Sequence, residues 1–593
     1  MGLTESMMAN ARKLLSAGQV DKARSVLAEV VRANPGNAQA SMMLGSLEGA
    51  AGRPVEAAAW FRRAVEAAPL VADAHYNLGL SLANQGQDAE AERALAEAVR
   101  LAPTHAAAHY ARGVSLRRLR RFVDAIESQR LAIRHNPKLG GAYFHLANGL
   151  RDQGRGVEAL EAYRMAIAID PLIEGARTNR LAGFNFISAD PATVLAEHRA
   201  YGDSLIARAG PTRPHANDRS ADRVIRLGIL SPDLRMHSCA YFIEPLLARF
   251  DRNRFEVTCY YNYPKEDETT ARLRALASRW RSVWQVMPAD ADAMIRADGI
   301  DVLVECSGHT DWARLDIMAR KPAPVQGTWL GYPNTTGLST IDFRLVDSIS
   351  DPGPPPRKGN ADAHCVERLV RIDPCNWCFR PALDAPEVAP PPFERAGHIT
   401  FGSFNNLAKL SDAAVELWAR VLMRVPHSRL LLKSPSMADP RTVETVHARF
   451  ARHGVEAGRI ERIAYTNSPR EHLETYARVD IQLDSFPYHG TTTTCESFWQ
   501  GVPVVTLTGG VHAARVSTSL LRAVGLGELA ADTPEGFIEA AASLALDPAR
   551  LSRIRRELRG MMERSPLRDE AGFAKRFGDA VAAEFARWCA QPR

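Results

Sequence analysis

The stretch GNAQASMMLGSLEGAAGRPVEAAAWFRRAVEAAP, residues 36–69, belongs to a pattern that repeats through the first third of this 593-residue chain. Its closing proline recurs every 34 residues, at Pro35, Pro69, Pro103, Pro137 and Pro171. Alanines keep the same interval, at Ala23, Ala57, Ala91, Ala125 and Ala159. Small side chains let two antiparallel helices approach closely and proline ends a helix, so each interval predicts one helical hairpin. We expect five such units over residues 4–173.

These hairpins resemble the tetratricopeptide repeat in length and in the position of the closing proline. Single units of this kind cannot bury their apolar faces, and they stack into a superhelix with a concave inner surface. The resemblance implies that this surface holds an extended peptide or a partner protein. A purely structural array or an oligomerisation surface is the alternative.

The pattern changes after residue 173. Residues 174–222 predict a helical linker, with a helix over 196–209 and then the polar segment GPTRPHANDRSADR, residues 210–223. Strand and helix patterns then alternate, which favours a parallel, doubly wound, Rossmann-like sheet over residues 223–380. The expected strands cover residues 224–230, 255–261, 302–305, 325–329 and 341–346.

A proline-rich connection, residues 381–396, separates this half from a second alternating series over residues 397–593. Its expected strands cover residues 398–401, 429–433, 460–465, 479–483 and 503–507, with further helices at the C-terminus. Open sheets of this type bind ligands at the carboxyl ends of their strands, and nucleotides are typical ligands there.

The composition is that of an ordinary globular chain. Hydrophobic residues make up 46%, and the net charge of +6 is too small for the length to indicate a nucleic-acid-binding protein. The eight cysteines lack framework spacing, and no apolar stretch has the length of a signal peptide core or a membrane span. These features predict a cytoplasmic protein with reduced thiols, without a membrane or nucleic-acid partner.

One segment of the second half predicts an anion site. In DSFPYHGTTTTCESFWQG, residues 484–501, a strand ends, the chain turns at Gly490, and Thr491, Thr492 and Thr493 lead into a helix. Free N–H groups and the positive end of the helix dipole suit a diphosphate. Glu496, one turn further on, could accept hydrogen bonds from ribose hydroxyls. The alternative is an ordinary threonine-rich helix cap.

Two further strand ends carry candidate residues. FGSFNNLAKL, residues 401–410, places Asn405, Asn406 and Lys409 just before a helix, where a cation could neutralise a leaving phosphate. SPDLRMHS, residues 231–238, places His237 just past the first strand of the first half, facing the same cleft.

At these motifs the chain resembles the O-linked N-acetylglucosamine transferases and their SPINDLY-type relatives. The matching stretches are SPDLRMHS, PAPVQGTWLGYPNTTG (322–337), FNNLAK (404–409), SPREH (468–472) and HGTTTTCESFWQGVPVVT (489–506). The resemblance implies repeats followed by a two-Rossmann-domain (GT-B type) glycosyltransferase that is inverting and metal-independent. It would use a nucleotide sugar and act on Ser or Thr side chains of proteins, which the repeats would select.

The resemblance also implies roles for individual residues. Lys409 would hold the diphosphate, Asn406 and His472 would line the nucleotide site, and Glu496 would bind the ribose. Gly490, Thr491, Thr492 and Thr493 would cap the phosphates. His237 would be the candidate general base.

The chain departs from the animal members of the family at several positions. Asn406 stands where they commonly carry Gln, Glu496 where they carry Asp, and residues 489–491 replace an Asn-Gly-His run. The inner asparagine ladder of their repeats is thin, because the equivalent residues are Met43, Asn77, Ala111, His145 and Asn179.

The leading hypothesis is transfer of N-acetylglucosamine from UDP-GlcNAc to proteins. GDP-fucose, as used by SPINDLY-type relatives, is the alternative donor, and a catalytically inactive repeat scaffold that senses a nucleotide sugar is a third possibility. A sugar-nucleotide epimerase built on the same halves would leave the repeats unexplained.

Two weaker patterns are compatible with metal binding. Cys375 and Cys378 have CxxC spacing without a second pair, and Asp290 and Asp292 resemble a metal-binding carboxylate pair but lie at the start of an expected helix. We interpret both as structural and predict no metal.

Overall fold

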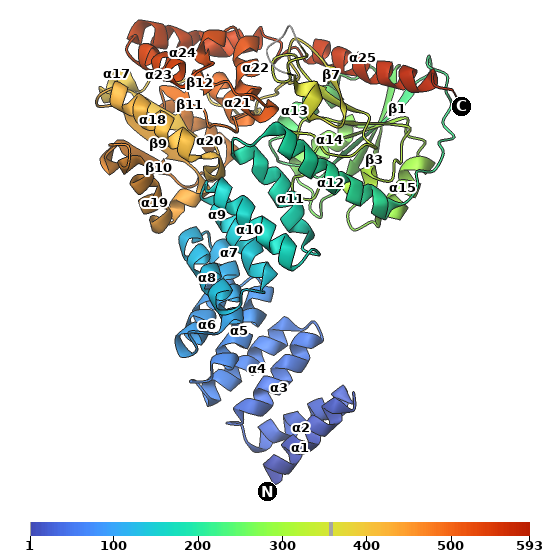
Figure 1. The fold of residues 1–593 in the computed structure, drawn as a ribbon, viewed down its shortest axis with the longest axis vertical. Helices are drawn as coiled ribbons and strands as arrows, with labels where there is room; N and C mark the ends of the chain where they lie inside the picture. Colours follow the sequence, from blue (N-terminus) through green and yellow to red (C-terminus); the bar gives the residue numbers. More distant parts are fainter. Residues whose placement is uncertain (1, 355–359, 593) are drawn as a thin grey trace. The chain divides into compact units, whose positions relative to one another are not determined.

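The computed structural model describes residues 2–354 and 360–592, so Arg593 of the expected second half lies outside the described residues (Figure 1). The chain divides into two compact units. One contains Met1–Gln153, Val157–Ala176 and Asp439–Val443, and the other contains Gly154–Gly156, Arg177–Ala438 and Glu444–Arg593.

The repeat unit consists of five helical hairpins, as the spacing of prolines predicted. Its helices are α1 (Leu3–Ser16), α2 (Val20–Ala33), α3 (Ala38–Ala50), α4 (Pro54–Ala67), α5 (Ala72–Asn84), α6 (Asp88–Leu101), α7 (Ala106–Arg118), α8 (Phe122–His135), α9 (Gly140–Asp152) and α10 (Gly156–Ile169). Gly45 of α3 lets the ring of Phe61 approach, because a Cβ there would lie 2.7 Å from that ring. The hairpin turns need a left-handed residue, and at the one turn without glycine Arg120 adopts φ 60°.

The expected linker is largely part of the second unit. It forms α11 (Glu174–Gly183), the 3-10 turn η1 (Phe184–Phe186) and α12 (Pro191–Ala209), and the second unit begins at Arg177. His198 of α12 is buried and accepts a hydrogen bond from the Tyr332 hydroxyl, with 2.7 Å between Nε2 and the oxygen. A Cβ on Gly202 would collide with the backbone oxygen of Gly337. Close backbone packing therefore joins α12 to the 332–338 loop, which the polar composition of residues 210–223 did not indicate.

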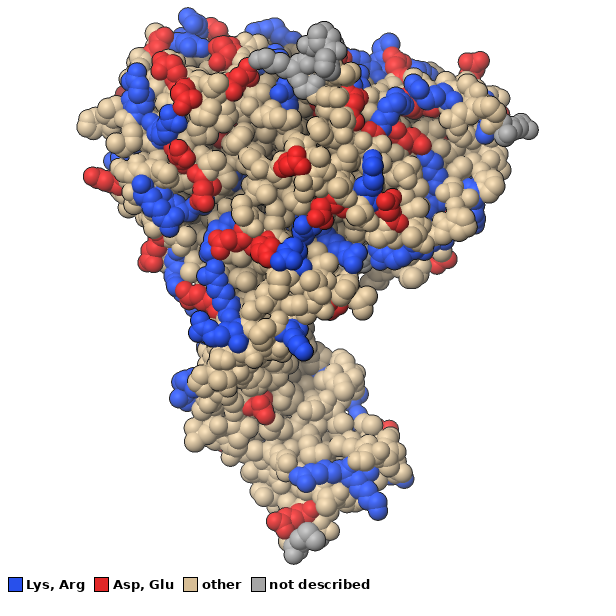
Figure 2. Space-filling view, viewed as in Figure 1, with Lys and Arg blue, Asp and Glu red and all other residues tan. Residues whose placement is uncertain are grey.

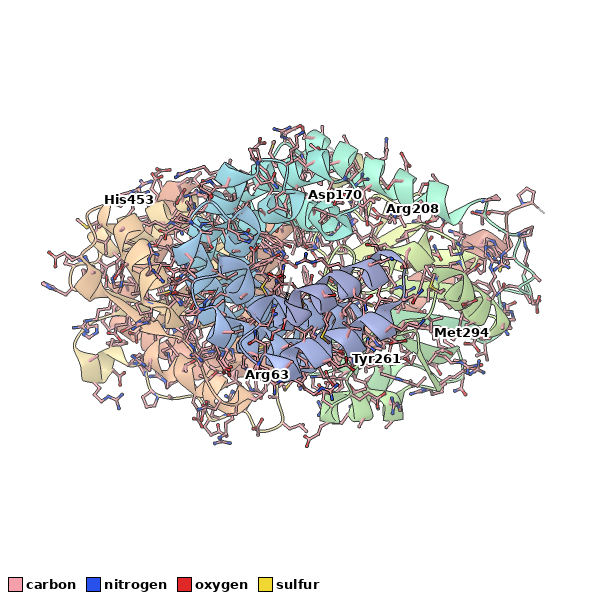
Figure 3. The ribbon with its side chains drawn as sticks, turned by 90° about the horizontal axis from the view of Figure 1, so that it is seen from below. Arg63, Asp170, Arg208, Tyr261, Met294 and His453 are labelled. Atoms are coloured by element: carbon pink, nitrogen blue, oxygen red, sulfur yellow. The ribbon has the colours of Figure 1, made fainter. Side chains whose placement is uncertain are left out.

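The first α/β half is built on a seven-stranded, wholly parallel sheet with the order β3-β2-β1-β4-β5-β6-β7. Its strands are β1 (Ile225–Ser231), β2 (Phe255–Tyr261), β3 (Arg279–Ser282), β4 (Val302–Glu305), β5 (Val325–Thr328), β6 (Phe343–Val346) and β7 (Arg368–Arg371). Its helices are α13 (Ala240–Arg249), α14 (Glu268–Leu276), α15 (Pro288–Ala297) and α16 (Leu315–Met318). Tyr261 at the end of β2 and Met294 on α15 mark this half in Figure 3.

The second half has a six-stranded parallel sheet with the order β10-β9-β8-β11-β12-β13. Its strands are β8 (Thr400–Ser403), β9 (Arg429–Lys433), β10 (Ile460–Ile463), β11 (Ile481–Leu483), β12 (Val504–Leu507) and β13 (Ala530–Ala531). Its helices are α17 (Phe393–Ala396), α18 (Asp412–Arg424), α19 (Pro440–Ala451), α20 (Pro469–Glu474), α21 (Thr492–Trp499), α22 (Val516–Ala523), α23 (Pro534–Ala545) and α24 (Pro548–Glu563).

Two features differ from the sequence-based expectation. The edge strands β3, β7 and β13 were not expected, because β3 and β7 are short and rich in arginine and β13 has two residues. The last helix, α25 (Glu570–Cys589), was grouped with the second half, yet it packs on the first, as Figure 1 shows. The rings of Phe573 and Phe577 of α25 lie 5.9 and 5.1 Å from Trp329.

The helices of the described residues do not include one with the length and apolar character needed to cross a bilayer. On the face drawn in Figure 2, basic and acidic side chains are interspersed.

Candidate active site

Two loops of the second half converge because their strands are neighbours in the sheet. β8 and β11 pair directly, so the loops that begin at Phe404 and Asp484 leave the same edge. Asn405 bridges the loops: its amide nitrogen donates to Asp484 Oδ1 at 3.3 Å, and its amide oxygen accepts from Thr493 Oγ1 at 2.8 Å. The backbone N–H of Gly490 donates to the same Asp484 oxygen at 2.8 Å. The corner formed by residues 404–409 and 484–496, here called the donor corner, is thus held by a connected hydrogen-bond network.

Lys409 lies inside the donor corner, where the sequence motif placed it. Its Nζ donates to the backbone oxygen of His489 at 2.6 Å and lies 3.8 Å from the centre of the Tyr488 ring. Burial lowers the pKa of Lys409 to about 8, while Asp484 acts in the opposite direction. A desolvated ammonium group at this position is well placed to meet an incoming polyanion.

The helix α21 starts at this corner and leaves its N-terminal end open. Thr491, the N-cap residue, makes no side-chain capping hydrogen bond, so the first N–H groups of the helix are not covered by it. Gly490 is required, because a Cβ there would collide with Thr493 Oγ1. The Thr493 hydroxyl donates a hydrogen bond to Asn405, and Thr492 is the first residue of the helix. Thr491 therefore does not act as an ordinary threonine cap, and anion binding by residues 490–493 stays a prediction.

Glu496 and His472 come together one helical turn further along. His472 Nε2 donates to Glu496 Oε2 at 3.0 Å, and the Tyr476 hydroxyl donates to the same oxygen at 3.3 Å. Lys433, at the end of β9, donates from Nζ to His472 Nδ1 at 2.5 Å. Sequence reasoning missed Lys433, although its place at a strand end is the same signal that identified Lys409.

A small cavity opens beside this group of polar side chains. It is lined by Tyr241, Phe379, Pro381, Ala382, Pro469, His472, Leu473, Glu496 and Trp499. Aromatic rings next to a carboxylate suit a nucleoside, whose base is flat and whose ribose carries hydroxyls. Asn406 lies apart from these contacts: its side chain is exposed and accepts from the backbone N–H of Ala408, and Asn405 makes the contacts to residues 484–493.

His237 lies in the loop between β1 and α13 on the first half. Its side chain is 37% exposed, and its Nδ1 lies 3.4 Å from Asp233 Oδ1. Burial and the nearby Arg235 lower the pKa of His237 to about 4, so the imidazole is neutral near pH 7 and able to accept a proton. Burial raises the pKa of Asp233 to about 6.

Tyr488 interacts electrostatically with groups of both halves. Burial raises the pKa of its hydroxyl to about 12, and the Cys239 thiol, two residues from His237, contributes to that shift. The Lys409 ammonium group lies over the same ring. Tyr241 and Phe379 of the first half line one cavity with His472 and Glu496 of the second, so the two halves meet beside the donor corner. That His237 faces the same cleft stays a prediction.

Sequence reasoning also missed His309, which follows β4. Its side chain is fully buried, its Nε2 donates to the backbone oxygen of Thr336 at 2.7 Å, and burial lowers its pKa to about 3. Its ring packs on His198 and Tyr332. His309 therefore holds the PNTTG turn, residues 333–337, in position through this hydrogen bond.

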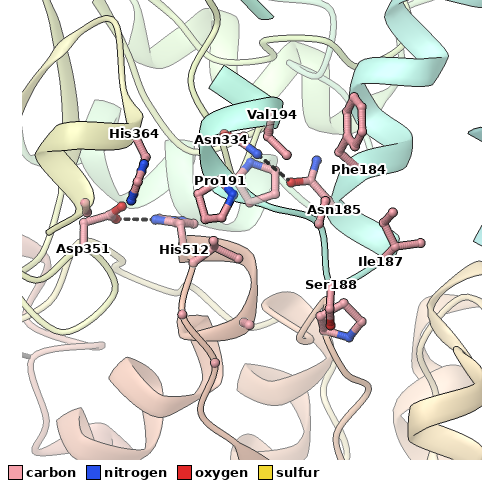
Figure 4. Close-up of a pocket in the computed structure, with 18 of the residues that line it drawn as sticks. Phe184, Asn185, Ile187, Ser188, Pro191, Val194, Asn334, Asp351, His364 and His512 are labelled. Atoms are coloured by element: carbon pink, nitrogen blue, oxygen red, sulfur yellow. Dashed lines mark hydrogen bonds and ion pairs between the residues drawn. The ribbon is translucent and has the colours of Figure 1, made fainter. Parts of the chain in front are cut away.

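A second cavity, of about 260 Å³, lies next to the donor corner (Figure 4). Its wall includes Phe486 and Pro487, which directly precede Tyr488, and residues of η1 and α12. Figure 4 shows the ion pair between Asp351 and His512 and the hydrogen bond of 3.2 Å from Asn334 to Asn185. Phe486 and Pro487 belong to the donor corner, so the cavity and the donor corner share a wall.

The residues of the two weaker patterns have structural roles. Asp292 is buried and forms ion pairs with Arg296 and Arg213, while Asp290 lies in the first turn of α15. Cys375 and Cys378 are buried, and burial raises the pKa of Cys378 to about 12. The absence of a required metal stays a prediction.

Comparisons with known proteins agree with this geometry. The model of glycosyl transferase family 41 matches residues 205–355 and 395–577, and a tetratricopeptide repeat model matches residues 8–72, 61–103 and 76–139. A solved structure of a mutant Thermobaculum terrenum O-GlcNAc transferase superimposes with a TM-score of 0.78 at 32% identity, covering 87% of this chain and 98% of the other.

Curated relatives share the sequence over shorter spans. The chain is 39% identical over 423 residues to the probable UDP-N-acetylglucosamine–peptide N-acetylglucosaminyltransferase SPINDLY of Solanum lycopersicum, covering 70% of this chain and 44% of the relative. It is 30% identical over 366 residues to the probable enzyme SEC of Arabidopsis thaliana, covering 59% of this chain and 36% of that one. The chain thus spans less than half the length of these relatives.

Proposed function

This chain belongs to glycosyltransferase family 41, and on that basis we propose that it moves N-acetylglucosamine from UDP-GlcNAc to Ser or Thr hydroxyls of proteins, with inversion and without a metal. The observation that carries the proposal is a buried cation beside an open helix end, next to a cavity that residues of both halves line.

The donor corner supports binding of a nucleoside diphosphate sugar. The diphosphate would lie against the N-terminus of α21 beside Lys409. The ribose would reach Glu496, which His472 already orients at 3.0 Å, and the base would enter the cavity between Tyr241 and Pro469. In this arrangement His472, Lys433 and Tyr476 act through Glu496 and are positioning residues.

The transfer would be a single displacement. His237 would accept the proton of the acceptor hydroxyl as its oxygen attacks the anomeric carbon, and the bond from that carbon to the diphosphate would break. Lys409 and the N–H groups of α21 would stabilise the charge that grows on the departing diphosphate. These fixed positive groups do the work that a divalent cation does in other transferases, which is why we propose a metal-independent reaction.

We propose that the repeats select protein acceptors. A shortened chain that separates this role from catalysis should begin near Arg177, because α12 carries His198 and packs on the 332–338 loop, and a start near Pro214 would remove it. Interspersed surface charges and free thiols at all eight cysteines, each among the described residues, support a cytoplasmic protein without a nucleic-acid partner.

The decisive experiment compares donors on the full chain. Binding titrations and protein-acceptor assays with UDP-GlcNAc and GDP-fucose, each with and without excess chelator, should show preference for UDP-GlcNAc and persistence of transfer. Abolition by the chelator would overturn the metal-independent mechanism. Donor binding without transfer to any protein would favour the nucleotide-sugar-sensing scaffold.

A protein O-fucosyltransferase is the second candidate. The identity to the SPINDLY relative, 39%, exceeds the 30% to SEC. Preferential binding and turnover of GDP-fucose in the same titration would replace the leading proposal by this one.

A further inference from the structure

Three side chains of metal-ligand type come together in the histidine loop. In the described part of the chain, the ligand atoms of Asp233, His237 and Cys239 all lie within 4.8 Å of one another. Asp233 and Cys239 are buried, whereas His237 is 37% exposed and gives access from the cleft. No step of the proposed transfer uses Cys239.

The loop is held in place by contacts outside this trio. The backbone N–H of Asp233 donates to Ser231 Oγ at 3.0 Å, and the backbone N–H of Met236 donates to Asp267 Oδ2 at 2.8 Å. The ligand atoms are therefore close together because the backbone is fixed at both places. A preformed set of ligands lowers the cost of binding, since little ordering remains to be done.

The chemistry of the trio selects the kind of cation. One thiol, one imidazole and one carboxylate suit a borderline-soft divalent ion such as Zn²⁺, whereas Mg²⁺ and Ca²⁺ prefer oxygen ligands. Tetrahedral Zn²⁺ sites with bonds of about 2.0 to 2.3 Å separate their ligand atoms by roughly 3.3 to 3.8 Å. The separation of 3.4 Å between Asp233 and His237 falls in that range.

One cation and two carboxylates influence the trio. Arg235 lies 3.9 Å from Asp233, whereas Asp311 raises the pKa of Asp233 and Glu305 raises the pKa of Cys239. Three protein ligands would leave one coordination position for water, at the mouth of the cleft.

We propose that Asp233, His237 and Cys239 form an inhibitory site for a thiophilic divalent cation. On binding, the Cys239 thiol loses its proton to solvent and forms a bond to the metal, His237 and Asp233 supply the other protein ligands, and the hydrogen bond from the thiol to Asp233 is lost. A metal-bound His237 has no free electron pair at the bound nitrogen and is fixed in orientation, so transfer stops. The inhibition rests on the proposed function, whereas the binding of the cation does not.

Cobalt binding tests the site without any assay of transfer. The full chain, freed of metals with a chelator, is titrated with Co²⁺, and the thiolate-to-cobalt absorption band is followed and then displaced with Zn²⁺. We expect one bound ion in the wild type, loss of the band in Cys239→Ser, and an unchanged band in the control Cys589→Ser, whose thiol lies on α25. A band that survives Cys239→Ser, or that disappears in Cys375→Ser, would overturn the proposal.

A second variant covers the case in which Cys239→Ser does not fold. Asp233→Asn keeps the shape of the side chain and removes the anionic ligand, and it should weaken Zn²⁺ binding by at least about 10-fold. Unchanged affinity in a folded Asp233→Asn variant contradicts the site.

Activity then tests the inhibition. Zn²⁺ should inhibit wild-type transfer at concentrations at least about 10-fold lower than those that inhibit Cys239→Ser. If Zn²⁺ fills the site but transfer continues, the inhibitory role is wrong. If the cobalt band forms and depends on Cys239 but the chain transfers no sugar, the proposed function fails while the metal site stands.

Discussion

The donor corner and the histidine loop are built differently. In the donor corner, Asp484, Asn405, Gly490 and Thr493 form a connected network, and Lys409 is bonded to the backbone. The His237 side chain lies 3.4 Å from Asp233 and 3.3 Å from the Cys239 backbone nitrogen, and it is partly exposed. The difference fits the roles proposed for them, a preorganised corner for a constant donor and a partly exposed histidine for varied acceptors.

The largest loss of turnover should come from a substitution in the histidine loop. We expect His237→Ala to lower turnover by roughly 100- to 10,000-fold, the range of general-base catalysis, with little change in the dissociation constant of the donor. Turnover and a nucleotide titration check this. His453→Ala, an exposed histidine labelled in Figure 3, is the matched control and should change stability by about 0.5 kcal/mol or less. Near-wild-type turnover in His237→Ala would remove the base assignment.

The second-largest loss of turnover should come from Lys409→Ala. Loss of an electrostatic group beside the leaving diphosphate costs roughly 3 to 4 kcal/mol, or on the order of 100- to 1,000-fold in rate. The exposed Lys575, which pairs with Asp579 at 2.7 Å, is the control, and Lys575→Ala should keep wild-type turnover. A collapsed thermal melt in Lys409→Ala would make the residue structural, and a wild-type rate would discard its role.

The pH dependence of donor binding should show the burial of Lys409. Its pKa is lowered to about 8, so the cation is present below that pH and is lost as the pH rises through it. The dissociation constant of the nucleoside diphosphate should therefore increase from about pH 7 to about pH 9, and bound diphosphate should raise the pKa. Isothermal titration across this range should give a flat profile for Lys409→Met. An equal slope in both proteins would assign the effect to another group.

The smallest kinetic change should come from a substitution in the repeats. Asn77, at the position of the asparagine ladder, is partly exposed on α5. If it binds the acceptor backbone, Asn77→Ala removes a hydrogen bond worth about 0.5 to 1.5 kcal/mol, which is roughly a 2- to 12-fold rise in KM for a protein acceptor. The dissociation constant of the donor should not move. Unchanged KM with several acceptors would argue for a structural array.

Much of the architecture followed from local patterns. The interval from Pro35 to Pro171 predicted every hairpin of the repeat unit, and alternating strand and helix patterns predicted ten strands of the two sheets. The strands that were missed, β3, β7 and β13, are short, and neither arginine nor a pair of residues produces a strand pattern. The match to family 41 over both halves confirms the family that the motifs indicated.

The site was predictable in part. Lys409, Gly490 and Glu496 were found because strand ends and helix starts are visible in sequence. Asn405, Lys433 and Tyr488 were not assigned roles, because their partners lie 88, 39 and 79 residues away along the chain: Thr493, His472 and Lys409. The prediction that residues 174–222 form a separate linker was wrong for the same reason. His198 of α12 is hydrogen-bonded to Tyr332, which lies 134 residues away along the chain.

The sequence by itself determined the repeats, the two α/β halves and the residue types of the donor corner, because each depends on neighbours within about one helix or one turn. Only the tertiary structure decided which side chains meet. A parallel sheet brings strand ends together in the order β10-β9-β8-β11-β12-β13, which is not chain order, so contacts such as Asn405 with Thr493 depend on topology. Burial decided the rest, because desolvation lowers the pKa of Lys409 and of His237, and desolvation depends on how the two halves pack.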